Sequence, residues 1–207
     1  TGLNGQGKTN LIDAIHYLGL TRSYFSNVDT HNYKHGSDFV RIEGRFQKSN
    51  KQIKVVSKLQ KSKQKIFEKD NKKYDKLLEH IGVIPIVFIA PKDQDLINEG
   101  SEFRRKFIDS TLSQIDKDYL KALVEYKYVL RQRNELLKSK DSNSSIDSSI
   151  LGIYDSKLDV SGSFIFEKRK HYLSKMIPVF SRKYKIISNS GENCSFKYRS
   201  KLHENNL

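Results

Sequence analysis

The sequence predicts an α/β lobe with an antiparallel β meander, followed by a helical lobe. Apolar residues recur at helical spacing between Thr9 and Leu20, and apolar and polar residues alternate between Phe39 and Phe67. Helical spacing then returns after Pro91. At roughly 150 residues per domain, a chain of 207 residues can form one large domain or two small lobes. We therefore expect lobes at residues 1–100 and 101–207.

The α/β lobe is expected to open with a helix over Thr9 to Leu20. One side of this helix is apolar and is expected to face the core; it carries Leu11, Ile12, Ile15 and Leu18. The stretch from Arg22 to Ser37 is polar and has no period, so it predicts a long loop.

The alternating segment predicts strands with one solvated face. Its first strand alternates between charged residues and the apolar Val40, Ile42 and Phe46. Short polar breaks at residues 48–51 and 61–63 separate the strands, and the third is expected near residues 64–68. This order predicts an antiparallel meander.

The longest apolar run, Ile81 to Ala90, has two implications. It is about half as long as the ~20 residues that a membrane span needs, and it contains Pro85. The sequence therefore predicts no transmembrane helix and no membrane partner. Residues 83–90 instead predict a central strand that is covered on both faces.

Two capped helices are expected to open the helical lobe. Ser101 is the expected N-cap of the first helix and Asp116 of the second. The serine-rich residues 139–149 predict a polar connector. A third helix is expected over residues 150–177, with the proline that follows it as a stop or kink. Residues 192–199 are expected to return as a strand.

The composition bears on partners and on location. Lys and Arg number 38 against 24 acidic residues, which gives a net charge of +14 and favours a polyanionic partner. A single cysteine, Cys194, leaves no disulfide framework, so we expect a cytoplasmic protein. The chain starts at Thr1 and its only methionine is Met176, so we expect a fragment of a longer protein.

The first nine residues carry the motif with the clearest chemistry. Gly2 to Thr9 reads GLNGQGKT and matches G-x-x-x-x-G-K-S/T, the phosphate-binding loop of P-loop nucleoside triphosphatases. A chance match to its four fixed positions in a chain this long is on the order of one in a hundred. The alternative is a glycine-rich turn that happens to precede a helix.

Each fixed position in this loop has a chemical role. The glycines allow successive backbone N–H groups to converge on a phosphate, and the positive end of the following helix points at the same anion. Lys8 would bridge the β- and γ-phosphates, and Thr9 would offer its hydroxyl to Mg²⁺. The sequence therefore predicts ATP and Mg²⁺ as ligands.

The second half of such a site is missing from the sequence. No apolar run ends in Asp or Asp-Glu, the arrangement that would hold Mg²⁺ and polarise water. We therefore expect the hydrolytic carboxylate to lie beyond Leu207 or to be absent, and no catalytic residue is assigned.

Several segments together resemble the RecF family of bacterial recombination-repair proteins. The resemblance covers nearly the whole chain and is carried by residues 2–10, 20–23, 89–93, 102–109 and 126–137. RecF is similar to the ATPase heads of chromosome-maintenance and double-strand-break repair proteins, which are relatives of ABC transporter heads. The resemblance implies an incomplete P-loop fold of this type here, with ATP held by Gly2, Asn4, Gly5, Gln6, Gly7, Lys8, Thr9 and Asn10.

The resemblance also implies a function. RecF proteins are ATP-dependent DNA-binding proteins of replication, recombination and the SOS response to damage. They act at single-strand gaps and junctions, and RecO and RecR help to place RecA there. ATP is sandwiched in a homodimer on DNA, and slow, DNA-stimulated hydrolysis reopens it. The family's signature loop and catalytic carboxylate lie toward its C-terminus, so we expect this fragment alone neither to hydrolyse ATP nor to dimerise.

Two groups of basic residues are candidates for DNA contact. Residues 48–76 hold eleven lysines and three acidic residues, a local excess of +8, and Lys54 and Lys58 lie on the strands. The other group is Arg104, Arg105, Arg131 and Arg133 on predicted helices. The alternative for both groups is a solvated face or local ion pairs. Arg22, in the loop after the first helix, is a further candidate for nucleotide or DNA contact.

Two other function classes remain open from the sequence. A P-loop small-molecule kinase would need an acceptor site and an arginine-bearing lid, and no compact lid is legible in the sequence. The other class is an ATP-gated protein-interaction module, in which the net charge of +14 would reflect composition and not a DNA-binding surface. DNA binding by a basic groove should weaken by orders of magnitude as salt rises, which separates it from both.

Overall fold

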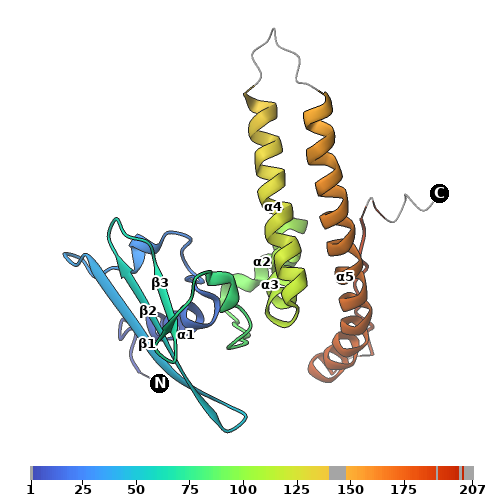
Figure 1. Ribbon diagram of the computed structural model, residues 1–207. Helices are drawn as coiled ribbons and strands as arrows, with labels where there is room; N and C mark the ends of the chain where they lie inside the picture. The colour runs from blue at the N-terminus through green and yellow to red at the C-terminus, as the bar shows by residue number, and fades with distance from the viewer. Residues whose placement is uncertain (1, 140–147, 190, 201, 203–207) are drawn as a thin grey trace. The chain divides into compact units, whose positions relative to one another are not determined.

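The computed structural model describes residues 2–139, 148–189, 191–200 and 202. The chain divides into two compact units, a first unit of Thr1–Glu99 and a second unit of Gly100–Leu207 (Figure 1). The connector predicted at residues 139–149 lies, except at its ends, outside the described residues.

An antiparallel sheet forms the frame of the first unit. Its strands are β1 (Phe39–Lys48), β2 (Lys51–Gln60), β3 (Ile66–Lys69) and β4 (Lys72–Lys73), in the order β1-β2-β3-β4. β1 and β2 pair along their full length. The predicted meander is confirmed, with the third strand two residues later than expected. Its central strand is the most buried, because β2 has a neighbour on each side.

Helix α1 (Lys8–Leu20) packs on this sheet through its C-terminal turns. Tyr17 and Leu18 join Val55 and Phe67 in the core of the first unit. Two glycines allow close approach on either side of the helix. A Cβ on Gly44 of β1 would lie 2.6 Å from Leu18 Cδ1, and one on Gly19 would lie 2.2 Å from Ile86 Cδ1.

The predicted inward face of α1 is only partly correct. Leu18 is buried, but Leu11, Ile12 and Ile15 are exposed by 67%, 50% and 44%. The reason is the limited reach of the sheet, which covers only the last turns of the helix. Within the described residues, the apolar side of the first two turns remains open to solvent.

The prediction of a central strand at residues 83–90 is wrong. Ile84 is buried, whereas Val87 and Ile89 are 87% and 83% exposed. Residues 83 and 84 lie in a turn and a bend, and residues 85–90 are not assigned to any of the four described strands. A strand covered on both faces needs neighbours that the described residues do not supply, so only one side of this segment packs, against α1. Short helical turns flank the sheet and this segment: η1 (Asp29–Asn32), η2 (Leu77–Glu79), η3 (Pro91–Gln94) and α2 (Asp95–Asn98).

The second unit consists of helices α3 (Ser101–Ile115), α4 (Lys117–Lys138) and α5 (Ser148–Ser188) (Figure 1). Its core includes Ile108, Leu112, Tyr119, Leu123, Ile165 and Leu173. Asp116 is the N-cap of α4, as predicted, since its side chain accepts hydrogen bonds from two backbone N–H groups of the first turn. The N-cap of α3 is Gly100 rather than Ser101, whose hydroxyl accepts a hydrogen bond from Arg105.

Two expectations for the last hundred residues need correction. Of the stop or kink expected at Pro178, the stop is wrong, because α5 continues to Ser188, and the strand expected at residues 192–199 is not formed. Instead the segment after the helix packs on it. Phe196 lies 5.1 Å from the Phe180 ring, and Ser181 donates a hydrogen bond to the Cys194 carbonyl. These contacts stabilise the helix past the proline and give the last segment a helical rather than a strand partner.

Candidate nucleotide-binding site

The loop before α1 has a backbone that requires glycine. Gly5 and Gly7 have φ values of +81° and +78°, in the left-handed region that side chains disfavour. Within the described part of the chain, no atom lies within 4 Å of a Cβ built on either glycine. The glycines are therefore needed for backbone conformation and not for space.

The start of α1 presents backbone N–H donors to this loop, and among the described residues no N-cap side chain bonds them. Gly7 is the N-cap and has no side chain with which to cap the helix. The first helical hydrogen bond runs from the Leu11 N–H to the Gly7 carbonyl, at 3.0 Å. The backbone N–H groups of the residues just before Leu11 therefore have no carbonyl partner within the helix. The first turn reads KTNL and contains no acidic residue. This end of the helix thus carries its positive partial charge toward the loop.

Lys8 lies across the loop that precedes it. Its ammonium donates to the carbonyls of Gly2 and Leu3, each at 2.6 Å. These contacts are exposed and hold the charge over the loop. The same ammonium can exchange carbonyl oxygens for phosphate oxygens without moving its backbone.

Residues 4–10 line a hollow of about 280 Å³ at the start of the helix. Its lining offers backbone N–H groups, one ammonium and one hydroxyl, which suit an anion rather than an apolar ligand. These groups fit a triphosphate, and residues 4–10 are the ones that would hold it. Thr9, exposed in the first turn, fits the role of a hydroxyl ligand to Mg²⁺.

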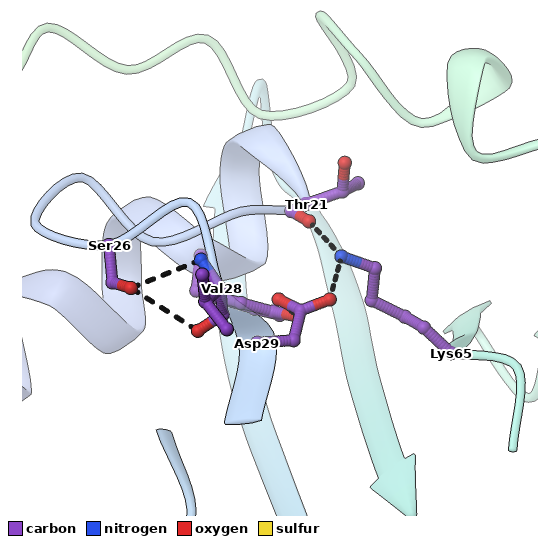
Figure 2. Close-up of polar contacts among 6 residues, drawn as sticks. Thr21, Ser26, Val28, Asp29 and Lys65 are labelled. Atoms are coloured by element: carbon purple, nitrogen blue, oxygen red, sulfur yellow. Dashed lines mark hydrogen bonds and ion pairs between the residues drawn. The ribbon is translucent and has the colours of Figure 1, made fainter. Parts of the chain in front are cut away.

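The opposite end of α1 is tied down by its own chain. Figure 2 shows Lys65 donating to the Thr21 carbonyl and to the Asp29 carboxylate, both at 2.8 Å. Tyr17 donates to the other oxygen of Asp29, also at 2.8 Å. In the adjoining turn the Ser26 hydroxyl bonds both backbone groups of Val28 (Figure 2). Burial and the bond to Asp29 raise the pKa of Tyr17 well above its usual value.

Arg22 lies at this far end and not beside the loop. It is exposed and follows the C-cap Thr21 directly. A helix of 13 residues is about 20 Å long at 1.5 Å per residue, which separates Arg22 from the phosphate-binding loop. The structure therefore brings Gly2 to Asn10 together and leaves Arg22 apart.

Most of the basic candidates for DNA contact have acidic neighbours. Lys54 lies 3.5 Å from Glu43, and Lys58 lies 2.5 Å from Glu68. In the second unit Arg131 pairs with Glu135 at 3.9 Å and Arg133 with Asp155 at 2.6 Å, while Arg104 and Arg105 are exposed on α3. Only the Arg131 pair is exposed on both sides, and such a pair contributes about 0–1 kcal/mol, so a phosphate can displace its carboxylate; the pairs of Lys54, Lys58 and Arg133 are partly buried.

Three polar residues near α1 were missed by the sequence reasoning. Asp13 accepts from the Ser23 hydroxyl and the Tyr24 N–H, and the Tyr24 hydroxyl donates to Asp93. These contacts span up to 69 residues and follow no local spacing. The only local signal is a carboxylate at Asp13, one turn after Thr9 and on the side of the helix opposite Leu11 and Ile15.

No cluster of three or more His, Cys, Asp or Glu side chains that could hold a metal occurs among the described residues. In the same part of the chain, every helix is too short or too polar to span a lipid bilayer.

The glycine loop, the helix behind it and the antiparallel sheet define a phosphate-binding-loop module of the ABC-ATPase type. No protein-family model matches the chain. Curated relatives do match it, and the chain is similar to proteins described as the DNA replication and repair protein RecF, the family that its sequence segments resemble. The RecF of Flavobacterium johnsoniae is 44% identical over 206 residues, and that of Parabacteroides distasonis is 38% identical over 206 residues.

The chain spans about half the length of these relatives. It is covered completely by both alignments, which take in 57% and 55% of the relatives' own sequences. Two solved structures, described as the recombination mediator protein RecF-ATPrS and RecF-ATP in the RecFOR pathway, have the same fold. Both give a TM-score of 0.84 at 31% identity over 91% of this chain and 51% and 50% of their own. The predicted fold class is therefore confirmed.

Proposed function

We propose that the full-length protein is a DNA replication and repair protein in which ATP binding at residues 2–10 switches DNA binding on. The observation that carries this proposal is the loop with left-handed Gly5 and Gly7 ahead of an uncapped helix. The similarity to RecF structures described with ATP and ATPrS supports the same ligand.

The chain's own residues have distinct tasks in this proposal. Backbone N–H groups of Gly5, Gly7 and the first turn of α1 bind the phosphates. Lys8 exchanges its loop carbonyls for β- and γ-phosphate oxygens. Thr9 holds Mg²⁺, which when bound neutralises phosphate charge. Asn4, Gln6 and Asn10 line the same hollow and orient the polyphosphate.

The other RecF properties follow as parts of the same proposal. The protein acts in the cytoplasm at single-strand gaps and junctions, dimerises on DNA when ATP is bound, and works with RecO and RecR in loading RecA. The RecFOR pathway is the one given for the similar solved structures. ATP hydrolysis is slow and is stimulated by DNA in the full-length protein.

The test is DNA affinity measured over a salt series, with and without Mg-ATP, on the full-length protein. We expect ATP to raise the affinity, and the logarithm of affinity to fall with the logarithm of salt by about 0.9 per phosphate neutralised. Binding that is insensitive to both ATP and salt would leave the kinase or the protein-interaction module as the better account.

A charge-reversal variant tests whether the sheet contributes to this binding. Replacing Lys54, Lys58, Lys61 and Lys63 by Glu should lower DNA affinity and flatten the salt dependence. The matched control reverses four exposed lysines of α5, which changes the net charge equally: Lys157, Lys170, Lys175 and Lys183. Equal effects of the two variants would show that only total charge matters and would return the sheet lysines to a solvated face.

A further inference from the structure

The segment after residues 83–90 folds into a tight turn around one carboxylate. The Asp93 N–H donates to the Ala90 carbonyl at 2.9 Å, and the Ala90 N–H donates to Asp93 Oδ2 at 2.7 Å. This turn is η3, and the chain runs from it through α2 to the start of α3.

Tyr24 joins this turn to the loop after α1. Its hydroxyl donates to Asp93 Oδ1 at 2.5 Å, and its ring lies 4.3 Å from Phe88 and 5.5 Å from His16 of α1. Burial and the hydrogen bond to Asp93 raise the pKa of Tyr24 to about 12. The hydroxyl therefore stays protonated at neutral pH and remains the donor.

The backbone of Tyr24 is in turn held by α1. Asp13 Oδ1 accepts from the Tyr24 N–H at 2.7 Å, and Asp13 Oδ2 accepts from the Ser23 hydroxyl at 2.6 Å. Asp13 lies one helical turn after Thr9, on the same side of the helix. A continuous set of hydrogen bonds thus runs from α1, one turn below the phosphate-binding loop, through Tyr24 to the η3 turn.

We propose that Tyr24 and Asp93 form a joint that couples nucleotide binding on α1 to the chain segment leading into the second unit. The inference rests on the proposed function, since it concerns regulation of the same ATP site. Both are positioning residues: neither lines the hollow at residues 4–10. A ligand that shifts or stiffens α1 moves Asp13. This movement reaches η3 through the hydrogen bonds from Asp13 to Tyr24 and from Tyr24 to Asp93.

The joint is suited to regulation because it can be broken without unfolding the first unit. The Tyr24 hydroxyl and the Asp93 carboxylate add to the ring packing of Tyr24 on Phe88, and that packing survives removal of the hydroxyl. Coupling between two sites in proteins is typically about 5–150-fold in affinity, which one such joint can carry.

The experiment compares Tyr24→Phe, Asp93→Ala and the double variant in the full-length protein. Mg-ATP affinity, hydrogen–deuterium exchange of residues 88–100 and DNA affinity are each measured with and without ATP. We expect each single variant to keep its ATP affinity within about twofold. The protection of residues 88–100 by ATP should disappear, and the ATP-dependent gain in DNA affinity should fall by about fivefold or more. The double variant should be no worse than Asp93→Ala, because the hydroxyl that Tyr24→Phe removes has Asp93 as its partner.

Tyr128→Phe is the matched control, since the Tyr128 hydroxyl accepts a hydrogen bond only from Gln132 on its own helix among the described contacts. It should leave all three measurements unchanged. Unaltered exchange and an unaltered ATP-dependent gain in Tyr24→Phe would overturn the joint, as would additive losses in the double variant. If the wild-type protein itself fails to bind ATP, the proposed function fails and the joint fails with it; if it binds ATP and only the variants behave like wild type, the joint alone fails.

Discussion

The two ends of α1 differ in the partners of their free backbone groups, the N–H groups at the start and the carbonyls at the end. At the N-terminal end, Lys8 to Ile12 are exposed, and the donors of the first turn face the hollow at residues 4–10. At the C-terminal end, residues 16–20 are buried, and Tyr17 is 1% exposed. Here the chain supplies its own partners. Lys65 donates to the Thr21 carbonyl, and the His80 ring bonds the Leu18 carbonyl at 2.6 Å.

This difference follows from the charges of a helix. The C-terminal carbonyls carry partial negative charge and are stabilised by donors, which Lys65 and His80 provide. Because a carbonyl only accepts, Nε2 of His80 is the donor to Leu18, and Nδ1 of the same ring lies 3.1 Å from the Tyr74 hydroxyl. The N-terminal donors have no such partners from acidic side chains in the first turn. One end of the helix therefore serves the fold, and the other is left for an anionic ligand.

The largest expected effect comes from breaking the buried end. The Tyr17 ring stacks on Phe67 at 5.9 Å within the core. Tyr17→Ala should lower the free energy of unfolding of the first unit by about 3–5 kcal/mol, as for other buried aromatic residues. Denaturant unfolding of the full-length protein measures this loss. Tyr17→Phe keeps the ring, removes the hydroxyl bond to Asp29 and should cost about 1 kcal/mol. Equal losses in the two variants would show that the ring is not what holds α1 to the sheet.

Breaking the open end should change ligand affinity and leave stability alone. Lys8→Ala removes a charge-assisted contact worth about 1.5–3 kcal/mol, so Mg-ATP affinity should fall about 10–100-fold. The free energy of unfolding should stay within about 0.5 kcal/mol, because the Lys8 bonds are exposed. Isothermal titration measures the affinity, with Lys63→Ala as an exposed lysine control. Unchanged affinity in Lys8→Ala would remove the basis for the nucleotide site.

The sequence predicted those parts of the first unit whose signals are local. The meander follows from alternation in β1 and β2, where each residue pairs with a neighbour across a short turn. The phosphate-binding loop follows because the left-handed conformations at Gly5 and Gly7 require glycine at those two places. In both cases residues close in the sequence determine the backbone.

The sequence failed where burial depends on distant partners. Periodicity shows that one side of α1 is apolar, but it does not show that the sheet reaches only as far as Tyr17 and Leu18. The apolar run at residues 83–90 likewise has a strand's composition, while its exposure depends on which strands lie beside it. The Tyr24–Asp93 contact joins residues 69 positions apart, and no spacing rule connects them. Tertiary contacts of this kind decided every incorrect prediction in the first unit.

A smaller effect is expected from altering the backbone at the open end. Gly7→Ala has room for its methyl group, so the only cost is the left-handed conformation, about 1–2 kcal/mol. In an exposed loop this cost appears on ligand binding, and Mg-ATP affinity should fall about 5–30-fold. Gly100→Ala is the matched control, because Gly100 has an ordinary φ of −65° and equal space around it. Equal affinities of the two variants would show that the loop does not need its left-handed glycine to bind phosphate.

The smallest expected effect is a pH dependence of stability that arises from His16, at the C-terminal end of α1. Burial beside Tyr24 and Phe88 lowers the pKa of His16 below its usual 6.5, and the Arg22 guanidinium adds to this; the Arg22 carbonyl and the Asp13 carboxylate oppose it. Below pH 6.5 the unfolded chain then binds a proton more readily than the folded one. The stability present above that pH should therefore fall as the pH is lowered, by at most about 1.4 kcal/mol per pH unit. Unfolding measured between pH 7.5 and 5.5 should show a steeper decline in the wild type than in His16→Gln, and parallel declines would mean that this histidine does not stabilise the buried end by remaining neutral.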